Sequence, residues 1–185
     1  MQMGILAVLA TAISLAMDAF SVSICIGIAQ RGAKLRTALI LGSAFGVFQF
    51  FMPLIGAEIA EHLSGFFNSW TPWIAAALIV WVAVKMIWET YKTGGSCPSL
   101  DVNTKNVIVL AFATSLDALA VGFSIESAGG SAFLLAGAAG VITFALSMAG
   151  GLGGGKMGEK MGQRAQYFGS GVLLCIAARI AYMAL

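Results

Sequence analysis

Six long apolar stretches follow one another along the chain, separated by short polar connectors. They cover residues 3–29, 37–60, 70–91, 106–126, 131–155 and 166–184. A helix needs about 20 predominantly apolar residues to cross the hydrocarbon core of a bilayer. The pattern predicts an all-α integral membrane protein, whose six transmembrane helices form a single membrane domain over residues 1–185.

The composition also favours a membrane protein over a soluble one. Of the 185 residues, 59% are apolar and only 10% are charged, whereas about 25% are charged in soluble domains. The lipid bilayer is therefore the expected surrounding, and a net charge of +2 is too small to indicate a nucleic-acid partner. The three cysteines are far apart and form no CxxC pair, so we expect neither a zinc site nor a disulfide framework.

The positive charges of the connectors fall on one side of the predicted membrane. Cytoplasmic loops of membrane proteins carry an excess of Lys and Arg. The first, third and fifth connectors contain such residues, and the second and fourth contain none. We therefore expect both termini outside the cytoplasm and a cytoplasmic loop at 93–104. The connector residues concerned are Arg31, Lys34, Arg36, Lys92, Lys105, Lys156, Lys160 and Arg164.

Two apolar segments each contain a carboxylate. Asp18 lies within "SLAMDAFSV", residues 14–22, and Asp117 lies within "ATSLDALAVG", residues 113–122. An Asp at the centre of a bilayer costs about 2.5–3.5 kcal/mol on insertion scales. Such residues usually mark the path of an ion or a substrate, so both are candidate functional residues.

The two segments are part of a longer internal similarity. Gly42 and Gly56 in the second stretch match Gly137 and Gly151 in the fifth at a similar offset. Residues 1–92 and 105–185 therefore read as two copies of one three-helix unit. Three is an odd number, so the second copy would be inserted upside down. Inverted repeats are typical of secondary transporters, which bind substrate at the midplane between the repeats; the alternative is chance similarity between apolar helices.

The residue types around these carboxylates are suited to a hard divalent cation. Asp18 and Asp117 supply two negative charges, and Gln49 supplies a neutral oxygen near the predicted midplane. Carboxylate and carbonyl oxygens are the ligands preferred by Mg, Ca and Mn. Alternatively, the nearby hydroxyls bond their own helices and the proline only kinks its helix. The predicted supporting residues are Ser14, Ser21, Thr114, Ser115, Met52 and Pro53.

Three motifs resemble a known family. They are "MDAF" at Asp18, "FGVFQFFMPLIG" around Gln49 and "ATSLDALAVG" at Asp117. In these motifs, and over essentially its whole length, the chain resembles the MntP-type manganese exporters, small bacterial inner-membrane proteins related to the LysE superfamily. The resemblance implies export of Mn(II), as transported substrate and not as a cofactor, across the inner (plasma) membrane. It also implies that the two aspartates are metal ligands. Lys85 and Glu89 resemble a basic and acidic pair of the family, which we interpret as a snorkelling interface pair; the alternative is that they form a gate.

Export of a dication needs a source of energy. Moving two charges against an inside-negative potential costs about 4.6 kcal/mol at 100 mV. The sequence offers no nucleotide-binding motif for this purpose, so we expect an antiporter in which protons and the metal compete for Asp18 and Asp117. The alternatives are export of another cation or small solute, an intramembrane aspartyl protease, or a scaffold. Neither aspartate lies in a GxGD motif, so we expect a transporter and not an enzyme. The sequence does not indicate an oligomeric state.

Overall fold

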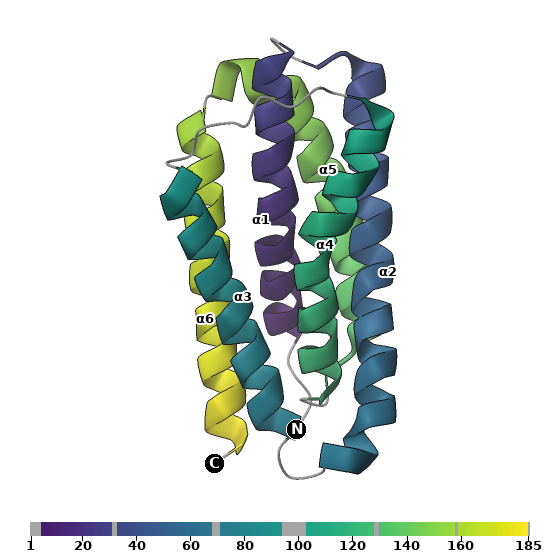
Figure 1. Cartoon of the computed structure of the whole chain (residues 1–185), viewed down its shortest axis with the longest axis vertical. Coiled ribbons are helices and arrows are strands. Elements are labelled where there is room, and N and C mark those ends of the chain that lie inside the picture. The colour runs from purple at the N-terminus through teal and green to yellow at the C-terminus, as the bar shows by residue number, and fades with distance from the viewer. Residues whose placement is uncertain are drawn as a thin grey trace.

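The computed structural model describes residues 5–30, 33–67, 71–93, 103–127, 130–157 and 159–184, and the regular secondary structure within these ranges is helical. This confirms the all-α prediction. Successive helices run in opposite directions along one bundle, so α1 begins at the end of the bundle where α6 finishes (Figure 1). The helices are α1 (Ile5–Ala29), α2 (Leu35–Phe67), α3 (Thr71–Thr93), α4 (Thr104–Ser127), α5 (Ala132–Met157) and α6 (Glu159–Ala184).

The outer surface of the bundle is apolar. Large side chains such as Leu6, Trp88 and Val141 are exposed on it, as expected where helices face lipid and not water. By length and composition, α1 to α5 could each cross a membrane. The chain is therefore a multi-pass membrane protein.

The sixth helix differs from the prediction. It starts at Glu159, so Lys160 and Arg164 lie on its first turns and not in a connector. Within the described residues, α6 lacks the combination of length and apolar composition expected of a membrane span. The physical reason is that its first half is polar, because it carries these two cations together with Gln163 and Gln166.

The helices divide into a scaffold and a peripheral pair. In the scaffold, α1 packs along α5, α2 packs along α4, and α2 also packs along α5. The pair α3 and α6 contact each other, and they join the scaffold where α6 packs on α1 and α3 packs on α4. Helices from the same half of the chain contact each other very little: α1 barely meets α2, and α4 barely meets α5.

Glycines bring the scaffold helices into close contact. A Cβ atom added to Gly122 of α4 would lie against the carbonyl oxygen of Pro53 in α2, and one added to Gly56 of α2 would lie against that of Leu119. Here the helices approach each other at the distance of their backbones, as small residues allow in membranes. The scaffold is therefore a tightly packed body that leaves little space for larger side chains at these contacts.

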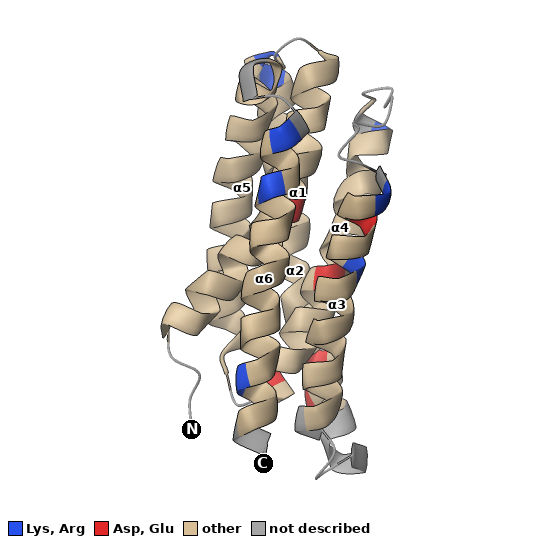
Figure 2. Ribbon diagram, turned by 90° about the vertical axis from the view of Figure 1, so that its left-hand side faces the viewer, with Lys and Arg blue, Asp and Glu red and all other residues tan. Residues whose placement is uncertain are grey.

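Basic residues gather toward one end of the bundle (Figure 2), whereas Arg179 lies in the second half of α6. The end of α3 carries Lys92, and the start of α4 carries Lys105. Arg31 and the side chain of Lys156 lie outside the described residues. Cys25 takes part in a disulfide bond, which contradicts the expectation drawn from cysteine spacing, since spacing along the chain does not report distance in the fold.

Candidate metal site

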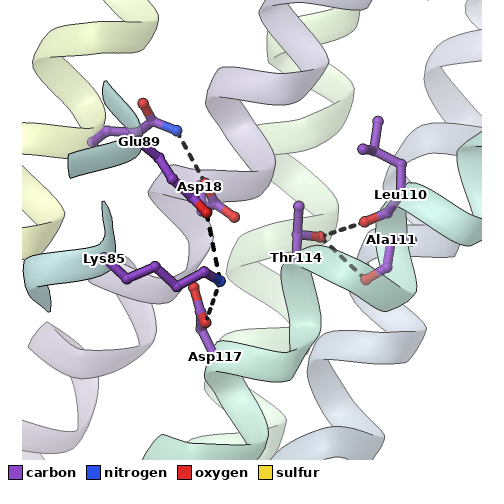
Figure 3. A network of polar contacts seen from close by, with 8 residues as sticks. Asp18, Lys85, Glu89, Leu110, Ala111, Thr114 and Asp117 are labelled. Atoms are coloured by element: carbon purple, nitrogen blue, oxygen red, sulfur yellow. Dashed lines mark hydrogen bonds and ion pairs between the residues drawn. The ribbon is translucent and has the colours of Figure 1, made fainter. Parts of the chain in front are cut away.

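The two aspartates lie near the middle of α1 and α4 and belong to one polar cluster. Asp117 is buried, with 5% of its surface exposed, and Asp18 is partly buried. Their side chains point toward the same region, where Lys85 and Glu89 of α3 also lie (Figure 3). The structure therefore brings together the two carboxylates and the predicted gate pair, from three different helices.

Lys85 is paired with Asp117. Its ammonium Nζ donates a hydrogen bond to Asp117 Oδ1 over 3.0 Å. The same Nζ lies 4.0 Å from Glu89 Oε1, one turn further along α3. The Lys85 side chain is 31% exposed and that of Glu89 is 56% exposed, whereas that of Asp117 is 7% exposed. Lys85 thus lies between a carboxylate buried in the bundle and one at the surface of the bundle.

Asp18 is held by α6. Gln166 Nε2 donates a hydrogen bond to Asp18 Oδ1 over 3.0 Å. The other end of the Gln166 amide, Oε1, lies 2.8 Å from the hydroxyl of Thr90 on α3. This hydroxyl is also 2.7 Å from the carbonyl oxygen of Met86, and Thr90 is 1% exposed. A chain of polar contacts therefore runs from α3 through α6 to the carboxylate on α1.

The charges of the cluster suit a dication. When ionised, its three carboxylates outweigh the single ammonium by two charges, the amount that a divalent metal would neutralise. Ionisable groups inside a membrane bundle are expensive and usually functional. Within the described residues, the structure contains no group of three or more His, Cys, Asp or Glu side chains placed to hold a metal ion. A metal bound here would therefore need neutral oxygen ligands besides the two aspartates.

Gln49, the predicted third ligand, is buried on α2 with 2% of its surface exposed. Its Oε1 accepts a hydrogen bond from the hydroxyl of Ser115 over 3.1 Å. Ser115 lies two residues before Asp117 on α4, which places the two side chains on different faces of that helix. The contact therefore joins α2 to α4 beside the carboxylate cluster, and its role as a ligand stays a prediction.

The other predicted supporting residues have separate partners. Ser14 donates to the carbonyl oxygen of Ala10 over 2.9 Å, and Thr114 donates to those of Leu110 and Ala111 on its own helix (Figure 3). Ser21 donates to Gly162 of α6 over 2.7 Å. Two further members are packing residues: Met52 belongs to the apolar core, and Pro53 lies inside α2 against Gly122.

Sequence analysis missed Gln166 and Thr90. Gln166 is the first residue of the predicted sixth span, and the polar residues before it make this end of the span resemble a connector. Thr90 is a single hydroxyl near the end of the third span. Its spacing of five residues from Lys85 gives no sign that the two side chains serve different aspartates. The sequence signal for Gln166 is an uncharged amide at the edge of an apolar span.

Comparisons with known proteins agree with the family resemblance seen in the sequence. Residues 32–181 match the Mntp family, described as "Putative manganese efflux pump". Proteins named "Putative manganese efflux pump MntP" are similar over most of their length. The one from Saccharophagus degradans is 35% identical, over 94% of this chain and 96% of the relative. Those from Methanocorpusculum labreanum and Corynebacterium glutamicum are 37% and 38% identical, over 95% and 97% of this chain and 94% and 97% of the relatives. No solved structure matches the chain.

Proposed function

This chain belongs to the Mntp family of manganese efflux pumps, and from that premise we propose that it exports Mn(II) from the cytoplasm. The family is one of transporters and not of enzymes, so the protease alternative has no support. The observation that carries the proposal is the meeting of Asp18 and Asp117 in one polar cluster within an apolar bundle (Figure 3).

Mn(II) binds, in this proposal, between Asp18 and Asp117 as the transported substrate. Two carboxylates neutralise one dication, which removes most of the cost of holding an ion at low dielectric. Gln49 joins as a neutral ligand if its hydrogen bond with Ser115 opens, because its amide oxygen would then be free to bind metal. Carboxylate and amide oxygens are suited to manganese.

The site lies, we propose, between two inverted repeats. Two observations support this arrangement. Exchanging α1, α2 and α3 with α4, α5 and α6 leaves the contact pattern unchanged, since the α1–α5 contact becomes α4–α2 and the α1–α6 contact becomes α4–α3. The corresponding helices also run in opposite directions (Figure 1). In transporters built this way, the substrate site lies near the midplane.

The basic end of the bundle faces the cytoplasm in this proposal. Positive charge near the ends of membrane helices is retained on the cytoplasmic side, and most Lys and Arg residues gather at one end (Figure 2). Both termini would then lie outside the cytoplasm. A bacterial protein that exports metal from the cytoplasm lies in the inner membrane. We therefore propose the inner membrane as the location of this chain.

Substitution of the aspartates tests the proposed function. Asp18→Asn and Asp117→Asn should each abolish manganese resistance, because each leaves the dication with one uncompensated charge. Growth in high manganese is the measurement, at protein levels matched by immunoblot. Glu58→Gln is the control, because Glu58 is an exposed carboxylate of α2. Growth at the wild-type level with either Asn variant would overturn the assignment.

Export of another cation is the second candidate. Oxygen ligands alone discriminate weakly among hard divalent cations. Uptake of Mn(II), Mg(II), Ca(II) and Fe(II) into inverted vesicles separates the two, and uptake confined to an ion other than Mn(II) would select this candidate.

A further inference from the structure

We propose that Lys85 is a tethered counter-ion of the metal site. Its ammonium pairs with Asp117 while the site is empty and moves to Glu89 when the metal binds. This inference rests on the proposed function, because it describes how the same site handles charge through a transport cycle.

The geometry provides both positions of the ammonium. Lys85 Nζ is 3.0 Å from Asp117 Oδ1 and 4.0 Å from Glu89 Oε1. Lys85 and Glu89 lie on α3 with a spacing of four residues, at which oppositely charged side chains on a helix can pair. A lysine side chain has four flexible carbons and a compact charge. Rotation about these bonds is enough to move the ammonium from one carboxylate to the other.

The empty site needs the first position. Asp117 is buried, and an ionised carboxylate without a partner in such a place is strongly disfavoured. In the part of the chain that the structure describes, Lys85 is the cation that pairs with it. The pair therefore replaces the missing metal and keeps the buried charge of α4 balanced.

The loaded site needs the second position. A dication at Asp117 would repel an ammonium a few ångströms away, because like charges interact strongly at low dielectric. Glu89, whose side chain is 56% exposed, offers the nearest carboxylate outside the metal position. The displaced ammonium is then neutralised by Glu89, and Asp117 has a cation beside it in both states.

This exchange also links metal binding to helix contacts. Lys85 belongs to the peripheral helix α3, and Asp117 belongs to the scaffold helix α4. Metal binding would break the ion pair between these helices and replace it with a pair inside α3. The bound metal therefore releases one polar tie between the peripheral pair and the scaffold, which is where relative movement would be needed.

Comparison of net efflux with exchange tests the inference. Net efflux of radiolabelled Mn(II) from proteoliposomes into manganese-free buffer requires the metal-free carrier to return. Exchange, with equal Mn(II) on both sides, requires only the loaded carrier to move. Lys85→Met keeps the length of the side chain and removes its charge. It should therefore lower net efflux by roughly tenfold or more, because Asp117 is left unpaired during the return, and leave exchange near the wild-type rate.

Equilibrium binding of Mn(II) to the purified protein is a second measurement, in which two variants should change the affinity in opposite directions. Lys85→Met should bind Mn(II) roughly fivefold more tightly, because no ammonium competes for Asp117. Glu89→Gln should bind it roughly threefold more weakly, because the displaced ammonium has lost its second partner. A merely structural role for the pair would weaken binding in both variants.

Lys92→Met is the matched control, because it makes the same substitution at an exposed position of the same helix. It should change neither flux nor binding. Lys85→Arg keeps the charge and should retain more net efflux than Lys85→Met. Equal loss of exchange and net efflux in Lys85→Met, or net efflux at the wild-type rate, would overturn the inference while the proposed function stands. Failure of the wild-type protein to move Mn(II) in either assay would instead refute the proposed function, and the inference with it.

Discussion

The carboxamide of Gln166 has a defined direction because its two ends meet different partners. Its nitrogen donates to Asp18 over 3.0 Å, and its oxygen lies 2.8 Å from the Thr90 hydroxyl. The Thr90 hydroxyl therefore orients the amide, and the amide in turn orients the carboxylate. Residues that position a metal ligand are often as important as the ligand itself.

Substitution of Thr90 tests this positioning. Thr90→Val replaces the hydroxyl by a methyl group of similar size, so Gln166 would lose the partner that fixes its orientation. We expect the manganese concentration for half-maximal transport to rise by roughly tenfold, the lower end of the range for loss of a ligand-orienting contact. Thr90→Ser, which keeps the hydroxyl, is the control, and flux against Mn(II) concentration is the measurement. Equal affinity in the two variants would show that Thr90 serves only its own helix.

The sequence identified the charged residues of the site but not all their partners. Asp18 and Asp117 are detectable because an isolated charge in an apolar run has few structural explanations. The pairing of Asp117 with Lys85, and of Asp18 with Gln166, depends on how the helices are rotated about their axes. Helix rotation is set by packing between segments far apart in the sequence, which a single sequence does not report.

The scaffold helices are positioned by close contacts between glycines of one helix and the backbone of another. Gly56 and Gly122 allow α2 and α4 to approach closely near Pro53. The glycine pattern in the sequence indicates the repeat, but not which glycines lie at a helix contact. The start of the last helix is predicted too late in the chain, because cations and amides at the end of a span resemble a connector.

Addition of a single methyl group tests the close contact. Gly122→Ala should lower the stability of the protein by about 1–3 kcal/mol, the usual cost of overpacking, because the added Cβ meets the backbone of Pro53 and not a movable side chain. Gly137→Ala is the control, since nothing lies within 4 Å of its added Cβ. The measurement is thermal unfolding in detergent. Equal midpoints for the two variants would show that α2 and α4 can separate without cost.

At the scale of the whole molecule, the bundle places its charge cluster between the scaffold and the peripheral pair. Asp18 and Asp117 lie on scaffold helices, and their hydrogen-bond partners lie on α6 and α3. Any shift of the peripheral pair relative to the scaffold would therefore change the contacts of both carboxylates together. Such an arrangement fits a carrier that alternates between two openings around one site.

Coupling to protons is tested at this scale. We infer that protons enter as Mn(II) leaves, because a proton on Asp18 and the Lys85 ammonium beside Asp117 would neutralise both aspartates after the metal has left. In proteoliposomes, an outward manganese gradient should drive protons inward, and an imposed pH gradient should drive manganese uphill. Liposomes with Asp117→Asn protein are the control for leakage. Manganese flux that is insensitive to the pH gradient and moves no protons would indicate a uniporter or a channel.

The distribution of helix contacts has a consequence for biogenesis. Each extensive contact joins a helix of the first half to a helix of the second, and α1 barely meets α2. When the first three helices have left the ribosome and entered the bilayer, they therefore have almost no surface to bury against one another. They must wait as separate lipid-exposed segments until α4, α5 and α6 are inserted, so the compact bundle can form only near the end of synthesis. A ribosome that stalls midway would leave an unassembled intermediate, with its glycine faces open to lipid and to quality-control proteases.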